Sequence, residues 1–220
     1  MEKHNGLLIT LSCFLLLLTS IGAIAKGLNA PQLAIQKTSN LIYNAAKENS
    51  ERLGDRDYAL ILVNDILEPQ LDLEKISRLV LGKHWRKASD EQKIAFQREF
   101  KTLLVNTYAS SFNEFSEWTV HFLPMSLEPE VKRTLVKTEV IQPSRPPVAV
   151  NYRMAITKEG IWKTYDVMIE GISMVTNYRS SFAKSIRESG GLDNVIQMLA
   201  EKNQLFESSQ LALDDSNPQS

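Results

Sequence analysis

Few side chains in this sequence combine the types and the spacing that catalysis requires. The best candidates are Tyr165 and Asp166, because a tyrosine and an acid inside a small apolar pocket can move protons. They are neighbours in a stretch that alternates as a strand does, and neighbours on a strand face opposite sides of a sheet. Only one of them could then enter a pocket, which weakens the interpretation of the protein as a small-pocket enzyme.

Other signatures of catalysis or metal binding are missing from the sequence. His84 and His121 belong to no zinc-type motif, and there is no G-x-S-x-G, phosphate-binding loop or dinucleotide fingerprint. The one cysteine, Cys13, lies in an apolar run near the N-terminus. We therefore predict no catalytic residue, no metal and no cofactor.

The elements that must position any binding site are organised around the stretch Trp162 to Phe182. Its first half alternates with a period of two, Gly171 interrupts it, and Val175, Tyr178 and Phe182 then recur at helical spacing. The pattern predicts a strand that bends and passes into a helix.

Composition limits the remaining possibilities. A chain of 220 residues with 43% hydrophobic content is typical of one globular domain. The formal net charge is −1 and the basic residues are not clustered, so nucleic acid is not an expected partner.

The N-terminus has the pattern of a secretory signal. Lys3 and His4 precede an apolar run that closes on Ala23-Ile24-Ala25, an A-x-A cleavage site. We predict a signal peptide over residues 1–25; an uncleaved anchor helix is the alternative. The mature chain would enter an oxidising compartment without cysteine, so an ordinary core must hold it. We expect one domain over 26–206 and a disordered tail over 207–220.

Helices precede the strands. Helical patterns cover Ala30 to Arg52, a helix capped by Asp55 and stopped by Pro69, and one from Asp72 to Gly82. Ser89 and Gln92 form a capping box before a long helix with an aromatic stripe. The stripe consists of Phe96, Phe100, Leu103, Leu104, Tyr108, Phe112 and Phe115. It fits either an ordinary core or the wall of a lipid pocket.

Strands follow at Trp118–Leu123, Val131–Ile141, Val148–Ile156 and from Trp162, and a last helix begins at Gly190-Gly191. The order predicts an α+β fold in which helices cover one face of an antiparallel sheet of about four strands.

Two blocks of this sequence resemble the signatures of the MlaC family, also called the toluene-tolerance auxiliary family. The first is Leu81-Gly-Lys-His-Trp85-Arg-Lys-Ala-Ser89-Asp-Glu-Gln92 with the aromatic stripe after it. The second runs from Trp162 through Tyr165-Asp-Val and Glu170-Gly-Ile-Ser173 to Asn177-Tyr-Arg179 and Phe182. The similarity covers roughly Ala30 to Asn203.

The resemblance implies a periplasmic carrier that binds phospholipid acyl chains in an apolar cavity between sheet and helices. Nothing in the sequence suggests an obligate oligomer, so we expect a monomer. Family members shuttle lipid between an outer-membrane lipoprotein–porin complex and an inner-membrane ABC transporter with an MCE-domain ring. Their usual role is to maintain outer-membrane lipid asymmetry.

Two sets of residues are candidates for this site. Strand faces and the aromatic helix suggest an acyl-chain lining of Phe96, Phe100, Leu104, Tyr108, Val136, Val148, Val150, Tyr152, Tyr165, Val167 and Ile169. Three cations, Arg153, Lys163 and Arg179, are candidates for the head-group phosphate. A periplasmic adaptor whose apolar groove binds a partner protein is the alternative from another class.

Overall fold

The computed structural model describes residues 27–52, 55–108 and 117–215, without the side chains of 56, 108 and 209–215. The predicted signal peptide, residues 1–25, lies outside the described residues, as do Phe112 and Phe115. Within the described ranges, no helix combines the length and the hydrophobicity that crossing a membrane requires.

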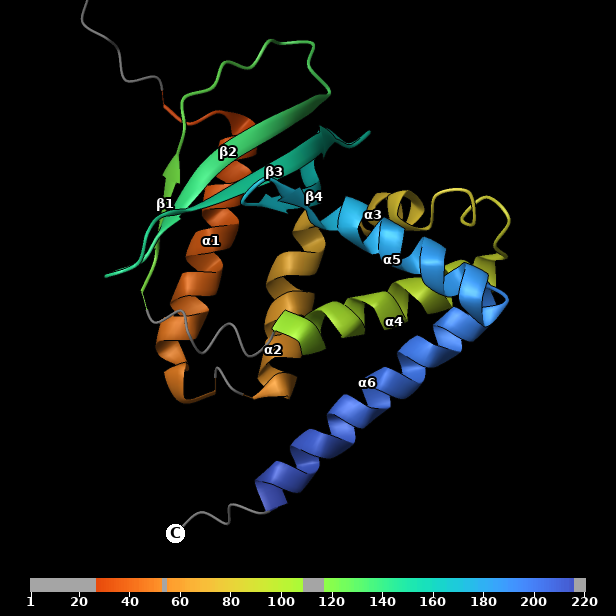
Figure 1. Ribbon diagram of the computed structural model, residues 1–220. Coiled ribbons are helices and arrows are strands. Elements are labelled where there is room, and N and C mark those ends of the chain that lie inside the picture. Colours follow the sequence, from red (N-terminus) through yellow and green to blue (C-terminus); the bar gives the residue numbers. More distant parts are fainter. Residues whose placement is uncertain (1–26, 53–54, 109–116, 216–220) are drawn as a thin grey trace, which may run out of the picture.

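Five antiparallel strands form one sheet in the order β1-β2-β3-β4-β5 (Figure 1). They are β1 (Thr119–Phe122), β2 (Arg133–Ile141), β3 (Val148–Ile156), β4 (Trp162–Ile169) and β5 (Ile172–Ser173). The predicted α+β class is confirmed, with one strand more than expected. The extra strand arises because Glu170 and Gly171 both have positive φ, 48° and 80°, as a two-residue hairpin turn requires.

The pairing of β3 with β4 contains an irregularity that the sequence pattern does not show. Arg153 lies opposite Asp166, whereas the next residue, Met154, lies opposite Thr164. Tyr165 is therefore the extra residue of a β-bulge, and the alternation of β4 is broken there.

The helices form a layer against the sheet and a bundle beside it (Figure 1). They are α1 (Ala30–Glu48), η1 (Ser50–Arg52), α2 (Arg56–Leu62), a π-helical turn η2 (Val63–Leu67), a 3₁₀ turn η3 (Glu68–Gln70), α3 (Leu73–Leu81), α4 (Asp90–Tyr108), α5 (Met174–Ser189) and α6 (Leu192–Asp215). Helix α1 packs on the sheet through Ile35, which joins Val136, Met154 and Trp162 in one buried cluster.

The predicted helix starts are confirmed by their hydrogen bonds. The N–H of Gln92 donates to the Ser89 hydroxyl over 3.2 Å, and the N–H of Ser89 donates to the Gln92 side-chain carbonyl over 3.0 Å. Asp72 accepts from the N–H of Lys75 and so caps α3, while its own N–H donates to the Thr164 carbonyl of β4. This last bond attaches the start of α3 to the sheet.

The aromatic stripe of α4 packs mainly against α5. The ring centres of Phe96 and Phe182 are 5.2 Å apart, and those of Phe100 and Tyr178 are 5.0 Å apart, both pairs edge to face. Phe96 is completely buried. This part of the stripe therefore belongs to an ordinary core of α3, α4, α5 and α6.

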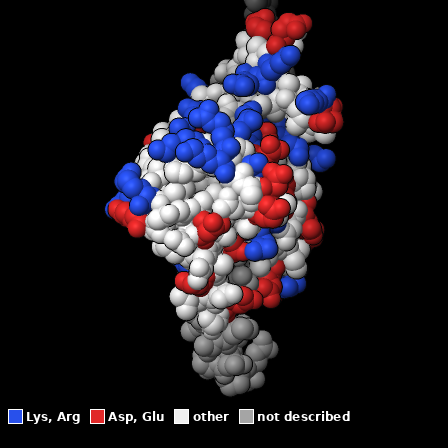
Figure 2. Space-filling view, turned by 90° about the vertical axis from the view of Figure 1, so that its right-hand side faces the viewer, with Lys and Arg blue, Asp and Glu red and all other residues white. Residues whose placement is uncertain are grey.

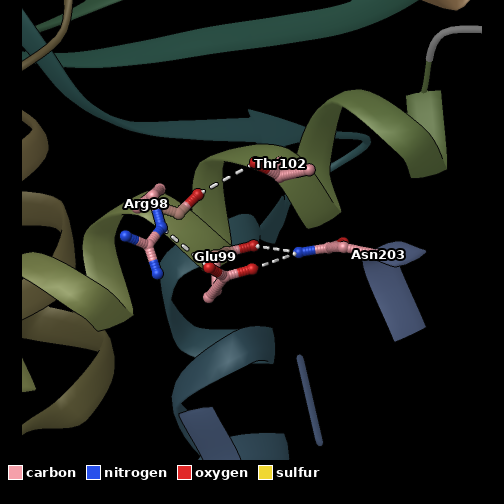
Figure 3. Close-up of polar contacts among 4 residues, drawn as sticks. All are labelled: Arg98, Glu99, Thr102 and Asn203. Atoms are coloured by element: carbon pink, nitrogen blue, oxygen red, sulfur yellow. Dashed lines mark hydrogen bonds and ion pairs between the residues drawn. The ribbon is translucent and has the colours of Figure 1, made fainter. Parts of the chain in front are cut away.

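A buried polar contact sets how α6 lies on α4 (Figure 3). The Asn203 amide donates to the backbone carbonyl of Glu99 and to its carboxylate, each over 3.0 Å, and its own carbonyl accepts from Asn106. Arg98 forms an ion pair with the other carboxylate oxygen of Glu99 over 2.8 Å. The buried Asn203 amide and the buried Glu99 carboxylate thus provide hydrogen-bond partners for each other.

The C-terminal end differs from the expectation of disorder from Glu207 on, because α6 continues to Asp215. The segment after Glu207 contains leucine, alanine and glutamine and no glycine or proline before Pro218, so helix propensity favours continuation of the helix. Residues 216–220 lie outside the described ranges.

Tyr152 of β3 faces α1 and packs against the buried cluster around Ile35. Burial raises the pKa of its phenol to about 12, and a hydrogen bond with Thr138 opposes this rise with a smaller effect. The folded protein therefore retains this proton well above the ordinary pKa of 10.

Replacing Asn203 with alanine should lower the free energy of unfolding by about 1–3 kcal/mol, because the Glu99 carboxylate loses a buried donor. Urea unfolding of Asn203→Ala checks this, with the exposed neighbour Gln204→Ala as control. Equal unfolding midpoints for the two variants would contradict the assigned role of Asn203.

Tyr152 should make stability depend on pH between about 10 and 12. Its raised pKa stabilises the fold fully below pH 10, and this contribution, about 2–3 kcal/mol, is lost as pH rises through 12. The unfolding free energy of Tyr152→Phe should therefore fall less steeply over this range than that of the wild type. Parallel pH dependences would show that Tyr152 titrates normally.

Candidate functional site

An apolar cavity of about 310 Å³ lies between β4 and the helices. Its walls come from η2, η3, α3, α4, β4 and the first turns of α5, together with Leu71 between η3 and α3. The apolar lining residues are Val63, Leu67, Leu71, Leu73, Ile76, Val80, Phe100, Leu104, Val105, Val167, Ile169, Met174 and Val175. A concave site with such a lining binds apolar ligands.

A second cavity of about 220 Å³ lies between α1 and the sheet. Ile35, Thr38, Ser39 and Ile42 line it from α1, and Trp118, Val120, Val140 and Tyr152 from the opposite side. Leu67 of η2 lines both cavities. The two apolar spaces therefore meet at this side chain.

Asp166 lines the first cavity beside Tyr165, because the bulge in β4 breaks the strand alternation at this point. Its carboxylate accepts from the Ser173 hydroxyl over 2.7 Å and from the N–H of Val175 over 3.1 Å, and pairs with Arg153 over 3.2 Å. The side chain is only 1% exposed. These bonds occupy the carboxylate, so the arrangement stabilises the start of α5 and leaves no free acid for proton transfer.

One ion pair lies on the edge of the first cavity. Lys101 of α4 donates to the Glu68 carboxylate of η3 over 2.8 Å and to the Asn64 side-chain carbonyl over 3.0 Å. Glu68 also lines an open polar hollow of about 660 Å³, whose other walls include Asp72, Glu74 and Lys163. The apolar cavity therefore adjoins a polar region at Glu68.

The structure brings together only part of the predicted acyl-chain lining. Phe100, Leu104, Tyr165, Val167 and Ile169 line the first cavity and Tyr152 the second. Four others line neither cavity: Phe96 and Val136 are completely buried in packed cores, and Val148 and Val150 are half-buried on β3. Tyr108 ends α4, and its side chain lies outside the described residues.

The three predicted head-group cations have different neighbours. Arg153 pairs with Asp166, Lys163 lines the polar hollow, and Arg179 packs over Gly82, with 3.2 Å from its guanidinium to the position that a Cβ would take.

Basic side chains gather on one face of the protein (Figure 2). Burial, and then the positive charges of Arg133 and Arg78, lower the pKa of Lys75. The Lys75 ammonium lies 4.1 Å from the centre of the Tyr165 ring, whose residue lines the first cavity. The positive charge of Lys75 thus lies beside a residue of the cavity wall.

The segment 63–76 contributes to the site, although its sequence pattern does not predict this. Leu67, Leu71, Leu73 and Ile76 line the first cavity from both sides of Pro69. The apolar residues around Pro69 are a signal, but their helical spacing does not distinguish a cavity wall from a packed core. Among the described residues, no cluster of His, Cys, Asp and Glu could hold a metal ion.

Comparisons with known proteins agree with this geometry. Residues 36–201 match the family described as MlaC protein. The toluene tolerance protein ttg2D of Pseudomonas putida is 28% identical over 196 residues, which cover 88% of this chain and 87% of that protein. The intermembrane phospholipid transport system binding protein MlaC of Haemophilus influenzae is 23% identical over 189 residues, 84% of this chain and 86% of that protein.

A solved structure shares the fold. It is the phospholipid-binding protein of Ralstonia solanacearum in complex with a phospholipid, with a TM-score of 0.76 and 26% identity. The match covers 81% of this chain and 99% of that one. The family match alone spans most of the sequence, and the order of helices and strands agrees with it: this chain belongs to the MlaC family.

Proposed function

We propose that this protein is a periplasmic phospholipid carrier that moves lipid between the outer and inner membranes and so maintains outer-membrane lipid asymmetry. The observation that carries the proposal is the apolar cavity between β4 and the helices, in a chain whose fold matches a protein solved with a phospholipid. The N-terminal apolar run with its A-x-A ending supports the periplasmic location. Family membership makes the chain a binding and transport protein, not an enzyme.

The physical need for such a carrier follows from the acyl chains. Two chains contain about 30 methylenes, and exposing them to water costs about 0.8 kcal/mol each, or about 24 kcal/mol in total. Phospholipid therefore cannot cross an aqueous compartment freely, whereas transfer from a membrane into an apolar cavity exchanges one apolar environment for another.

The two cavities suggest how one lipid could bind. One acyl chain would occupy the space between β4 and the helices, and the other would occupy the space between α1 and the sheet, on the two sides of Leu67. Both spaces have mainly aliphatic and aromatic walls, which supports this division. The head group would then remain near the surface, where Lys163 lines the polar hollow.

The proposed partners follow from the family resemblance. They are an outer-membrane lipoprotein–porin complex and an inner-membrane ABC transporter with an MCE-domain ring, and the carrier acts as a monomer between them. A cavity that exchanges lipid at little net cost sets no direction by itself, so direction must come from differential affinity or ATP use by these partners.

Native mass spectrometry of protein purified without detergent tests the proposal. The wild type should carry an extractable phospholipid, and Val167→Asp should carry less, because it introduces a carboxylate into the cavity wall. Val150→Asp is the matched control, since Val150 is also half-buried but lies outside both cavities on the neighbouring strand.

Two outcomes would contradict the proposal. Lipid-free wild-type protein that also takes up no lipid from vesicles would favour an adaptor that binds a partner protein. Equal lipid loss in both variants, with equal melting temperatures, would show that the cavity beside β4 is not the binding site.

A further inference from the structure

The apolar cavity and the polar hollow share a boundary formed by three residues. Glu68, Leu71 and Leu73 line both spaces. A ligand with its apolar part in the cavity and its polar part in the hollow must therefore pass the Glu68 side chain. The polar end of an amphipathic ligand would therefore be recognised at this boundary.

The Glu68–Lys101 pair is accessible at this boundary. The side chains of Lys101 and Glu68 are 26% and 38% exposed. Asp166 is the other charged residue of the lining, and its side chain is only 1% exposed and accepts from three donors. Within the described part of the chain, the pair thus supplies the charges of this cavity that a ligand can contact.

The backbone is irregular at the same place. The π-helical turn η2 ends at Leu67, and the 3₁₀ turn η3 begins at Glu68 with Pro69 inside it. Such a change of winding within a helical segment frequently marks a functional site. Here it places Leu67 at the junction of the two cavities and Glu68 at the junction of cavity and hollow.

We propose that Glu68 and Lys101 select a phospholipid with a zwitterionic amine head group over one with an anionic head group. This inference rests on the proposed carrier function. The phosphate of the lipid takes the place of the Glu68 carboxylate on the Lys101 ammonium, and the amine of the lipid pairs with Glu68. Each charge keeps a partner of opposite sign, so the exchange leaves no unpaired ion.

An anionic head group fits this pair less well. A glycerol head group brings a phosphate for Lys101 but no cation for Glu68, so the Glu68 carboxylate loses its partner and faces a like charge. Asp72 and Glu74 on the wall of the hollow add to this repulsion, and Lys163 offsets part of it. Selection therefore depends on Glu68, whereas Lys101 contributes to binding of either lipid.

The experiment incubates the purified protein with vesicles containing equal amounts of phosphatidylethanolamine and phosphatidylglycerol and measures both lipids on the re-isolated protein. The wild type should be enriched in phosphatidylethanolamine. Glu68→Gln keeps the size of the side chain and an acceptor for Lys101, and should lower the ethanolamine-to-glycerol ratio by about fivefold, as expected for a partly exposed ion pair. Lys101→Gln should lower total loading and change the ratio less.

Controls separate this inference from the carrier function. Lys184→Ala removes an exposed ion pair of α5, remote from the cavity lining, and should leave the ratio and the loading unchanged. Normal loading with the same ratio in Glu68→Gln and wild type would overturn the selection by Glu68 and leave the carrier function intact. Wild-type protein that takes up neither lipid would overturn both.

Discussion

The carboxylate of Asp166 is the contact on which the site depends. It lies within β4, next to the bulge, and it holds Arg153 from β3, the Ser173 hydroxyl from β5 and the N–H of Val175 from α5. These bonds fix the direction in which α5 departs from the sheet. The aromatic residues of α5 then pack on α4, so the distance between sheet and helices follows from this junction. An ionised carboxylate at a helix N-terminus also interacts favourably with the helix dipole.

The cavity persists because packed clusters hold its walls apart. On one side, the core of α3 to α6 contains Val80 and Phe100, which also form cavity wall. On the other, the cluster around Ile35 fixes α1 on the sheet. Between these clusters, the chain forms the π-helical turn η2 and the 3₁₀ turn η3. Just after η3, the N–H of Asp72 donates to the Thr164 carbonyl and attaches this segment to the sheet. A regular helix here would present a different set of side chains to the cavity.

The sequence predicts the elements well because their signals are local. Each of these signals depends on only a few neighbouring residues. They are the capping box at Ser89, the caps at Asp55 and Asp72, and the alternation of β2 and β3. The cavity is less predictable, because whether Phe96 fills a core or lines a pocket depends on how α5 packs against α4. The bulge at Tyr165 was invisible for a similar reason, since it is a property of the pairing between β3 and β4.

The size of the cavity connects binding to stability. The cavity opens to the surface, so in its empty form the apolar walls are in contact with water, and this contact makes the empty form less stable than the filled one. A ligand that fills this space restores contacts with its walls and stabilises the fold by mass action. Release of that ligand into water would cost this free energy, whereas an acceptor that offers another apolar environment compensates for it. A carrier of this design therefore requires partners that take up the ligand at the moment of exchange.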